Sequence, residues 1–169
     1  MIDDLDAAAA MLLTDPLGLF DRSVTQADSV DRDTLAEIQH RAMRKRFAEH
    51  YEGIEMLRKL ADRQGISAVD EFDDLVPLMF PHTAFKAYPA SLLIDKRFGT
   101  LAKWLDKQTV FDVGGVDMEG CSGLTEFVER LDDQTEVNVL TSSGTTGTMS
   151  LIPKSKMMTA YNMTEVWHR

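Results

Sequence analysis

The chain has 169 residues with 44% hydrophobic and 27% charged residues, an ordinary composition for one globular domain. Its formal net charge of −10 argues against wrapping a nucleic-acid backbone, because contact with many phosphates needs a basic face. Cys121 is the single cysteine, which excludes an intrachain disulfide and a cysteine-cluster metal site.

The first 33 residues are acidic and weakly patterned, with eight aspartates against two arginines. The opening MIDDLDAAAAMLL lacks the basic start of a signal peptide and is too short to span a bilayer, so the sequence predicts a cytoplasmic protein without a membrane span. Residues 1–33 are interpreted as a loosely held arm with a short helix at about 7–13. A helical lead-in docked on the rest of the chain is an equally weighted alternative.

From Asp33 onward, apolar residues recur at the spacing of one helix face, which predicts a single helix over residues 33–64. Asp31 or Asp33 can cap its start, and Gly65 can end it. The apolar residues recur at steps of mostly three and four: Leu35, Ile38, Ala42, Met43, Phe47, Tyr51, Ile54, Leu57 and Ala61.

The same predicted helix carries the basic residues Arg41, Arg44, Lys45 and Arg46. They admit two readings, an anion-binding patch or a solvated face paired in part with Glu37 and Glu49, and helical spacing favours the second. His40 and His50, ten residues apart, do not have the spacing of two metal ligands on adjacent turns and are expected at the surface.

The middle of the chain predicts short elements separated by glycine and proline. We expect a short helix in VDEFDDL, an extended connection in PHTAFK and a helix over about 91–107. Another helix should begin after a Ser122 or Thr125 cap and continue through Leu131. The chain then predicts a strand at about 136–140, a second strand through Met149 and Ile152, and a terminal helix announced by Pro153 and Ser155.

The segment LTSSGTTGTMSLIPKS places a run of hydroxyls and glycines between the two predicted strands. The glycines permit positive φ and close approach of the backbone, and successive amides and hydroxyls supply neutral donors that suit phosphate oxygens. The candidate binding residues are Thr141, Ser142, Ser143, Gly144, Thr145, Thr146 and Gly147.

Two common motifs do not describe this loop. A Walker loop has four residues between its glycines, then lysine and a helix, whereas two residues separate Gly144 from Gly147 and a predicted strand follows. The G-x-S-x-G nucleophile elbow does not occur in the sequence, since GCSG at 120–123 is one residue short. A plain flexible connection between strands is the structural alternative.

The order strand, SSGTTG, strand, helix resembles the phosphate loop of the adenylate-forming superfamily, which includes the acyl- and aryl-coenzyme A ligases. The wider VNVLTSSGTTGTMSLIPKS, with Phe85–Lys86 upstream, is most similar to the branch of phenylacetate–coenzyme A ligase and the acyl-protein synthetases of bacterial luminescence. The resemblance implies a helix-dominated α/β fold, the loop between two strands of the enzyme's large domain, and ATP and Mg²⁺ as cofactors. It is weaker over residues 34–140 and does not extend to residues 1–33.

The resemblance has departures. The superfamily usually continues the loop with Pro-Lys where this chain has Met149 and Ser150, although serine occurs at the lysine position in the branch named above. The resemblance does not assign the role of the superfamily's lysine to Lys154. The family's aromatic-Gly-x-Thr-Glu segment, ribose aspartate and mobile-domain lysine are absent from the 169 residues. We therefore expect residues 34–169 to be the incomplete N-terminal region of such a domain, with a sheet edge that favours self-association.

The reaction that the resemblance implies is attack of a carboxylate on the α-phosphorus of ATP, giving an acyl-adenylate and pyrophosphate, then transfer to a thiol or an amine. Donors and Mg²⁺ aimed at the departing pyrophosphate lower the barrier. The expected partners are a fatty or aromatic acid and either coenzyme A or an acyl-accepting protein, and these 169 residues are expected to be inactive alone. The alternative function is a non-catalytic helical interaction module that retains the loop as a relic.

Overall fold

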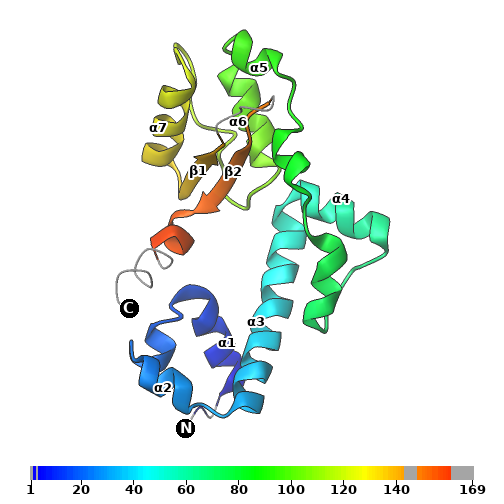
Figure 1. Ribbon diagram of the computed structural model, residues 1–169, viewed down its shortest axis with the longest axis vertical. Coiled ribbons are helices and arrows are strands. Elements are labelled where there is room, and N and C mark those ends of the chain that lie inside the picture. Colours follow the sequence, from blue (N-terminus) through cyan, green and yellow to red (C-terminus); the bar gives the residue numbers. More distant parts are fainter. Residues whose placement is uncertain (1, 3, 143–147, 161–169) are drawn as a thin grey trace. The chain divides into compact units, whose positions relative to one another are not determined.

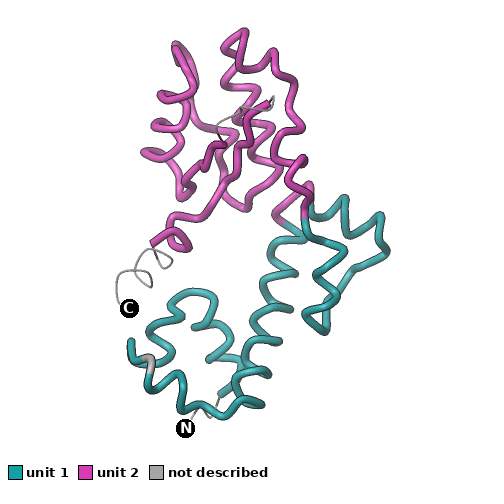
Figure 2. Tube along the Cα trace, in the orientation of Figure 1, with its two compact units in different colours: residues 1–52, 57–79 teal, residues 53–56, 80–169 magenta. Residues whose placement is uncertain are grey.

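The computed structural model describes residue 2, residues 4–142 and residues 148–160, which form mostly helices and one small two-stranded sheet (Figure 1). The prediction of a helix-dominated α/β chain is confirmed at this level. The chain divides into two compact units: unit 1 comprises Met1–Glu52 and Leu57–Met79, and unit 2 comprises Gly53–Met56 and Phe80–Arg169 (Figure 2). Within the described residues, no helix combines the length and the apolar character needed to cross a membrane.

The N-terminal residues of unit 1 are helical and packed. The Asp4 carboxylate caps α1 by accepting bonds from the amides of Asp6 and Ala7 at 3.0 and 2.9 Å. Ala8 and Ala9 are buried in one cluster with two residues of α3. Of the two alternatives for this region, the docked helical lead-in is the one observed. The helices that build unit 1 are α1 (Leu5–Thr14), η1 (Gly18–Phe20), α2 (Val24–Ser29), α3 (Arg32–Gly53), α4 (Glu55–Gln64) and η2 (Phe72–Leu78).

The prediction of a single helix over residues 33–64 is wrong, because α3 ends at Gly53 and α4 begins at Glu55. The residues at this break are held by the segment that follows α6. The Met56 amide donates to the Lys107 carbonyl at 3.0 Å, and a Cβ added to Gly53 would lie 2.9 Å from Cγ1 of Val110. The helical spacing of apolar residues therefore continues from α3 into α4. Tertiary contacts nevertheless end the first helix at Gly53.

The predicted ends of this helical region are correct. The Asp31 carboxylate accepts a bond from the Thr34 amide at 3.0 Å, as an N-cap residue does. Gly65 has a φ of +70°, and the following amide, that of Ile66, donates to the Ala61 carbonyl at 3.0 Å. This left-handed glycine ends α4 at its C-terminus.

Unit 2 departs from two local predictions. PHTAFK forms a 3₁₀ helix rather than an extended connection, and the predicted helix over 91–107 is two helices separated by Lys96 at a φ of 53°. The chain turns there because the Arg97 amide donates to the Leu92 carbonyl at 2.8 Å. The elements of unit 2 are η3 (His82–Lys86), α5 (Ser91–Ile94), α6 (Phe98–Asp106), α7 (Leu124–Gln134), β1 (Val137–Thr141) and β2 (Leu151–Ser155).

Helix α7 has the predicted apolar stripe but a different start. Gly123 is its N-cap residue, without a side-chain bond. The Glu126 carboxylate instead reaches back to accept bonds from the amide and the hydroxyl of Ser122, at 2.9 and 2.7 Å. Neither Ser122 nor Thr125 is therefore the cap.

The last described residues agree with the predicted terminal helix in part. Residues 156–160 are helical, and Oγ of Ser155 accepts a bond from the Met158 amide at 3.4 Å. Pro153 lies inside strand β2 instead of announcing the helix. The rest of the predicted helix, residues 161–169, lies outside the described residues.

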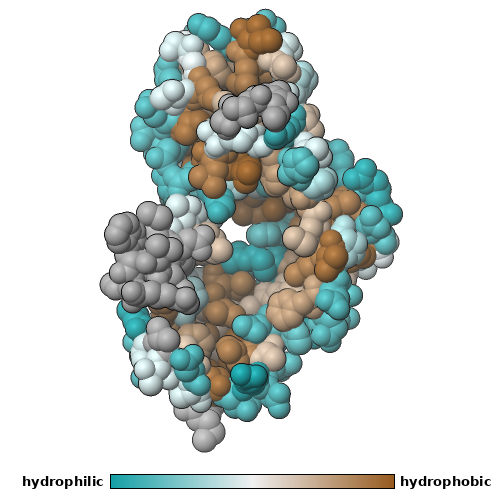
Figure 3. Space-filling view, viewed as in Figure 1, coloured by the Kyte–Doolittle hydropathy of each residue, from teal (hydrophilic) through white to brown (hydrophobic). Residues whose placement is uncertain are grey.

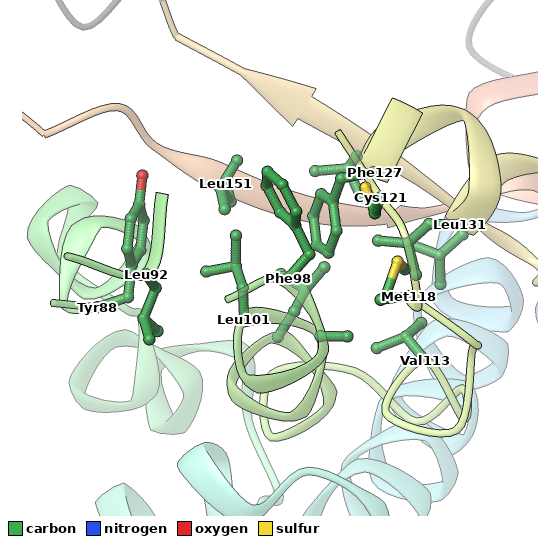
Figure 4. Close-up of a cluster of buried hydrophobic side chains, with 14 residues drawn as sticks. Tyr88, Leu92, Phe98, Leu101, Val113, Met118, Cys121, Phe127, Leu131 and Leu151 are labelled. Atoms are coloured by element: carbon green, nitrogen blue, oxygen red, sulfur yellow. The ribbon is translucent and has the colours of Figure 1, made fainter. Parts of the chain in front are cut away.

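The core of unit 2 joins α6, α7 and both strands. The rings of Phe98 and Phe127 are stacked with centroids 5.5 Å apart, and Figure 4 shows them beside Leu101 of α6 and Leu151 of β2. Strand β1 alternates as its sequence predicts, with its first and third residues buried and Asn138 only partly covered. The strands that flank the candidate loop are thereby fixed to the helices of unit 2.

Candidate functional site

The candidate loop connects the two strands of an antiparallel hairpin. In the register of the sheet, Val137 lies opposite Ser155, and Thr141 lies opposite Leu151. The prediction of a strand on each side of the loop is confirmed, although β2 begins at Leu151 and does not include Met149. Of the seven predicted binding residues, Thr141 and Ser142 are described, whereas Ser143, Gly144, Thr145, Thr146 and Gly147 lie outside the described residues.

One further pair of hydrogen bonds closes the base of the loop beyond the last strand pair. The Ser142 amide donates to the Ser150 carbonyl at 3.3 Å, and the Ser150 amide donates to Oγ of Ser142 at 2.9 Å. A serine hydroxyl that accepts a bond still has a proton to donate. Ser142 therefore closes the hairpin and keeps a neutral donor available for a phosphate oxygen.

The C-terminal flank of the loop is held from a distant part of unit 2. The Tyr88 hydroxyl donates to the Met149 carbonyl at 2.8 Å, and its ring meets that of Trp104 edge to face at 4.9 Å. Tyr88 is buried, and burial raises the pKa of its hydroxyl, so it acts as a neutral donor. The contact fixes the backbone at Met149, two residues after the end of the loop.

Sequence reasoning did not find Tyr88, and a single sequence gives no signal for it. Tyr88 and Met149 are 61 residues apart, and neither belongs to a motif. By contrast, Phe85–Lys86, which contributes to the resemblance, belongs to η3, and η3 lies against β2. The fold thus brings the upstream part of the resemblance next to the hairpin that carries its main motif.

The strands hold the base of the loop with one face in the core and one in solvent. Val139 and Leu151 are buried in the core of unit 2, whereas Leu140 is 43% exposed. Strands β1 and β2 therefore hold the described residues on either side of the candidate loop.

The site offers neutral donors rather than charge. Residues 141–152 contain no charged side chain. Among the described residues, no group of three or more His, Cys, Asp or Glu side chains is placed to hold a metal ion. Mg²⁺ commonly enters such sites with the phosphates of its nucleotide, keeping several waters and few protein ligands. The sequence of this segment thus offers hydroxyl and amide groups and no carboxylate.

Three arginines of the basic cluster on α3 are paired with carboxylates. Arg41 pairs with Glu37 at 2.7 Å, and Arg46 pairs with Glu49 at 3.2 Å, as the helical spacing predicts. Arg44 also lies 3.4 Å from a carboxylate oxygen of Asp70. The predicted pairing with Glu37 and Glu49 is confirmed.

The histidines of α3 are less exposed than predicted. The Nε2 atom of His40 lies 3.6 Å from Glu71, and its ring lies 4.9 Å from that of Phe72. His50 is partly buried, and burial lowers the pKa of its imidazole, with the nearby charge of Arg46 acting in the same direction. Both histidines therefore lie partly covered at the surface.

No family model, curated protein or solved structure matches this chain. The site is therefore defined by its own geometry: a hairpin, a hydroxyl-rich connection and the tyrosine that holds one flank. The adenylate-forming assignment stays a prediction that comes from the loop sequence.

Proposed function

We propose that the loop from Thr141 to Gly147 binds the β- and γ-phosphates of Mg²⁺-bound ATP, and that the chain takes part in ATP-dependent activation of a carboxylic acid. In that reaction a carboxylate oxygen attacks the α-phosphorus, the bond to the β-phosphate oxygen breaks, and pyrophosphate leaves. The acyl-adenylate then passes its acyl group to a thiol, of coenzyme A or a protein, or to an amine.

The observation that supports this proposal most is the hairpin. In a Walker loop, the phosphates bind at the N-terminus of the helix that follows the loop. Here strand β2 follows instead and pairs with β1. A connection of glycines and hydroxyls between two paired strands can bring its own amides and hydroxyls around an anion. The Ser142–Ser150 bonds fix the distance between the two ends of that connection.

Each part of the proposed site has a separate task. The loop hydroxyls donate to phosphate oxygens, and the two glycines let the backbone approach them. Tyr88 keeps the C-terminal flank in place through Met149 and does not itself contact the phosphates. Mg²⁺, when bound with ATP, neutralises charge on the departing pyrophosphate.

The proposal is tested by titrating the 169-residue chain with Mg²⁺-pyrophosphate and with Mg²⁺-ATP, followed by backbone amide NMR. We expect saturable shifts at Thr141, Ser142 and Ser150. Thr145→Ala should weaken binding about five- to thirtyfold, the effect of one lost hydrogen bond of roughly 1–2 kcal/mol. Thr125→Ala removes an exposed threonine of α7 and serves as the matched control, with unchanged binding.

Two results would contradict the proposal. Absence of saturable shifts with either ligand would favour the non-catalytic interaction module. Equal affinity in Gly144→Val and in the unaltered chain would show that the loop backbone does not approach the phosphates, because valine disfavours positive φ and adds a branched side chain. Pyrophosphate exchange with ATP in the presence of fatty and aromatic acids then tests whether binding leads to chemistry.

A further inference from the structure

Unit 1 contains a pocket that the loop chemistry does not use. Its volume is about 580 Å³, within the range typical of small-molecule sites. Helix α3 supplies its largest share of residues, and α1, α4 and η2 with the residue after it supply the others. The lining residues are Leu12, Leu13, Gln39, Ala42, Met43, Arg46, Phe47, His50, Leu57, Phe72, Leu75, Leu78 and Met79.

The apolar part of the pocket opens to solvent at η2. Met43, Phe47 and Leu78 are buried in one cluster, whereas Phe72 is 48% exposed and Met79 is 72% exposed. On the face of unit 1 seen in Figure 3, apolar surface gathers over α3 and over η2 beside it. An apolar recess with large exposed side chains at its opening is a feature of ligand sites.

The polar residues of the pocket follow one face of α3. Gln39, Met43, Arg46 and His50 are three or four residues apart in succession, so their side chains point to the same side of the helix. The described lining residues include no aspartate or glutamate, although the chain has 28 acidic residues. The lining thus combines an apolar floor with one positively charged side chain.

Arg46 is held in place and still has donors to offer. Its Nη2 donates to the Leu13 carbonyl at 2.9 Å, and its Nη1 donates to Glu49 at 3.2 Å. A guanidinium has five N–H donors, and these bonds use two of them. Because His50 is shifted toward its neutral form, the N–H donors of Arg46 that Glu49 and Leu13 do not use are the groups of the lining suited to bind an anionic oxygen.

We propose that this pocket binds a single-chain carboxylate amphiphile, with its apolar chain between α3 and η2 and its carboxylate at the Arg46 guanidinium. The absence of acidic residues from the described lining and the presence of Arg46 favour an anionic over a cationic head group. The proposal does not depend on the phosphate loop, which lies in unit 2.

The test uses the 169-residue chain with labelled methionine methyl groups, titrated with octanoate, decanoate and dodecanoate below their micelle concentrations. We expect saturable methyl shifts at Met43 and Met79, which line the pocket, and none at Met118 in the core of unit 2. Decanol, which has the same chain as decanoate without the charge, should bind about tenfold more weakly, the scale of one charge-assisted hydrogen bond.

Two pairs of variants locate the ligand. Arg46→Gln should weaken decanoate binding about tenfold and leave decanol binding unchanged, whereas Arg44→Gln on the same helix, outside the lining, should alter neither. Met79→Asp should weaken both ligands about tenfold, and Val76→Asp, three residues earlier and 62% exposed, should alter neither. Both of these positions are exposed, so folding should tolerate the aspartates.

Several outcomes would overturn this proposal. The pocket assignment fails if no carboxylate gives saturable shifts, or if Met79→Asp and Val76→Asp have equal effects. The head-group assignment fails if decanoate and decanol bind equally well to the unaltered chain. Shifts that begin only at the micelle concentration would indicate surfactant association with exposed apolar surface and would also overturn it. None of these results bears on pyrophosphate binding, so the two proposals can fail separately.

Discussion

The two units bury their apolar residues in different ways. Among the described residues, the cluster at the centre of unit 2 contains 14 buried residues from α5 and the segment before it, from α6, α7 and both strands, and from the segment between α6 and α7 (Figure 4). Unit 1 has two smaller clusters, and α3 contributes to both: Met43 and Phe47 to one, Ile38 and Ala42 to the other. Unit 2 is organised around one continuous core, and unit 1 around one long helix.

This difference indicates why the two candidate sites have different forms. A continuous core fixes both strands of the hairpin, so unit 2 presents a loop on a firm support. Two clusters on one helix leave a recess between the elements that flank it, and the pocket of unit 1 is lined mostly by residues of α1, α3, α4 and η2. Regions with fewer buried contacts also open more readily, which suits ligand entry.

The largest expected effect compares one phenylalanine from each unit. Phe127→Ala should lower the free energy of unfolding by about 3–5 kcal/mol, because its ring is fully buried and stacked on Phe98. Phe47→Ala should have a smaller effect, since Phe47 already borders the pocket and its neighbours can relax into it. Urea unfolding followed by circular dichroism measures both. Equal losses would contradict the comparison of one dense core with one open unit.

A smaller gain is expected at a polar defect in unit 2. The side chain of Gln108 is buried, and neither of its amide atoms has a hydrogen-bond partner among the described residues. Gln108→Met should raise the free energy of unfolding by about 1–2 kcal/mol, because it removes buried polar atoms while keeping the length of the side chain. The exposed Gln134→Met is the control, expected within about 0.5 kcal/mol of the unaltered chain. A loss at Gln108 would show that its amide is bonded in solution.

A similar but smaller gain is expected where the backbone of unit 2 is strained. Lys96 has a φ of 53° between α5 and α6, a conformation that glycine adopts at little cost. Lys96→Gly should therefore stabilise the chain by roughly 0.5–1 kcal/mol, measured as a higher Tm. Lys103→Gly within α6 should destabilise it by about 1 kcal/mol, because glycine is unfavourable inside a helix. A destabilising Lys96→Gly would show that this turn is not left-handed in solution.

The smallest expected effect is a pH dependence at the start of α7. Bonds from the hydroxyl and the amide of Ser122, together with the neighbouring Arg130, lower the pKa of Glu126 to about 2. A carboxyl with a lowered pKa in the folded state stabilises the fold above its ordinary pKa of 4.5 and loses that contribution as the pH falls toward 2. The Tm should therefore decrease across this window, and Glu126→Gln should flatten the decrease. An unchanged pH profile in the variant would contradict the assigned bonds.

The sequence by itself determined the features that depend on neighbouring residues. The apolar stripe of α7, the Asp31 cap, the Gly65 end and the two strands around the loop all follow from spacing, capping chemistry and β propensity. The seven candidate phosphate-binding residues are a local feature of the same kind. They are consecutive in the sequence, so their shared property, neutral donors on a glycine-rich backbone, can be read without the fold.

Only the tertiary structure decided the features that join distant residues. The break after Gly53 follows from contacts with Lys107 and Val110, although the apolar period runs through it unchanged. The bond from Tyr88 to Met149 and the pocket of unit 1 likewise bring together residues that no local pattern connects. The physical reason is that periodicity reports which face of an element is apolar, whereas packing against a partner decides where the element ends and what that face encloses.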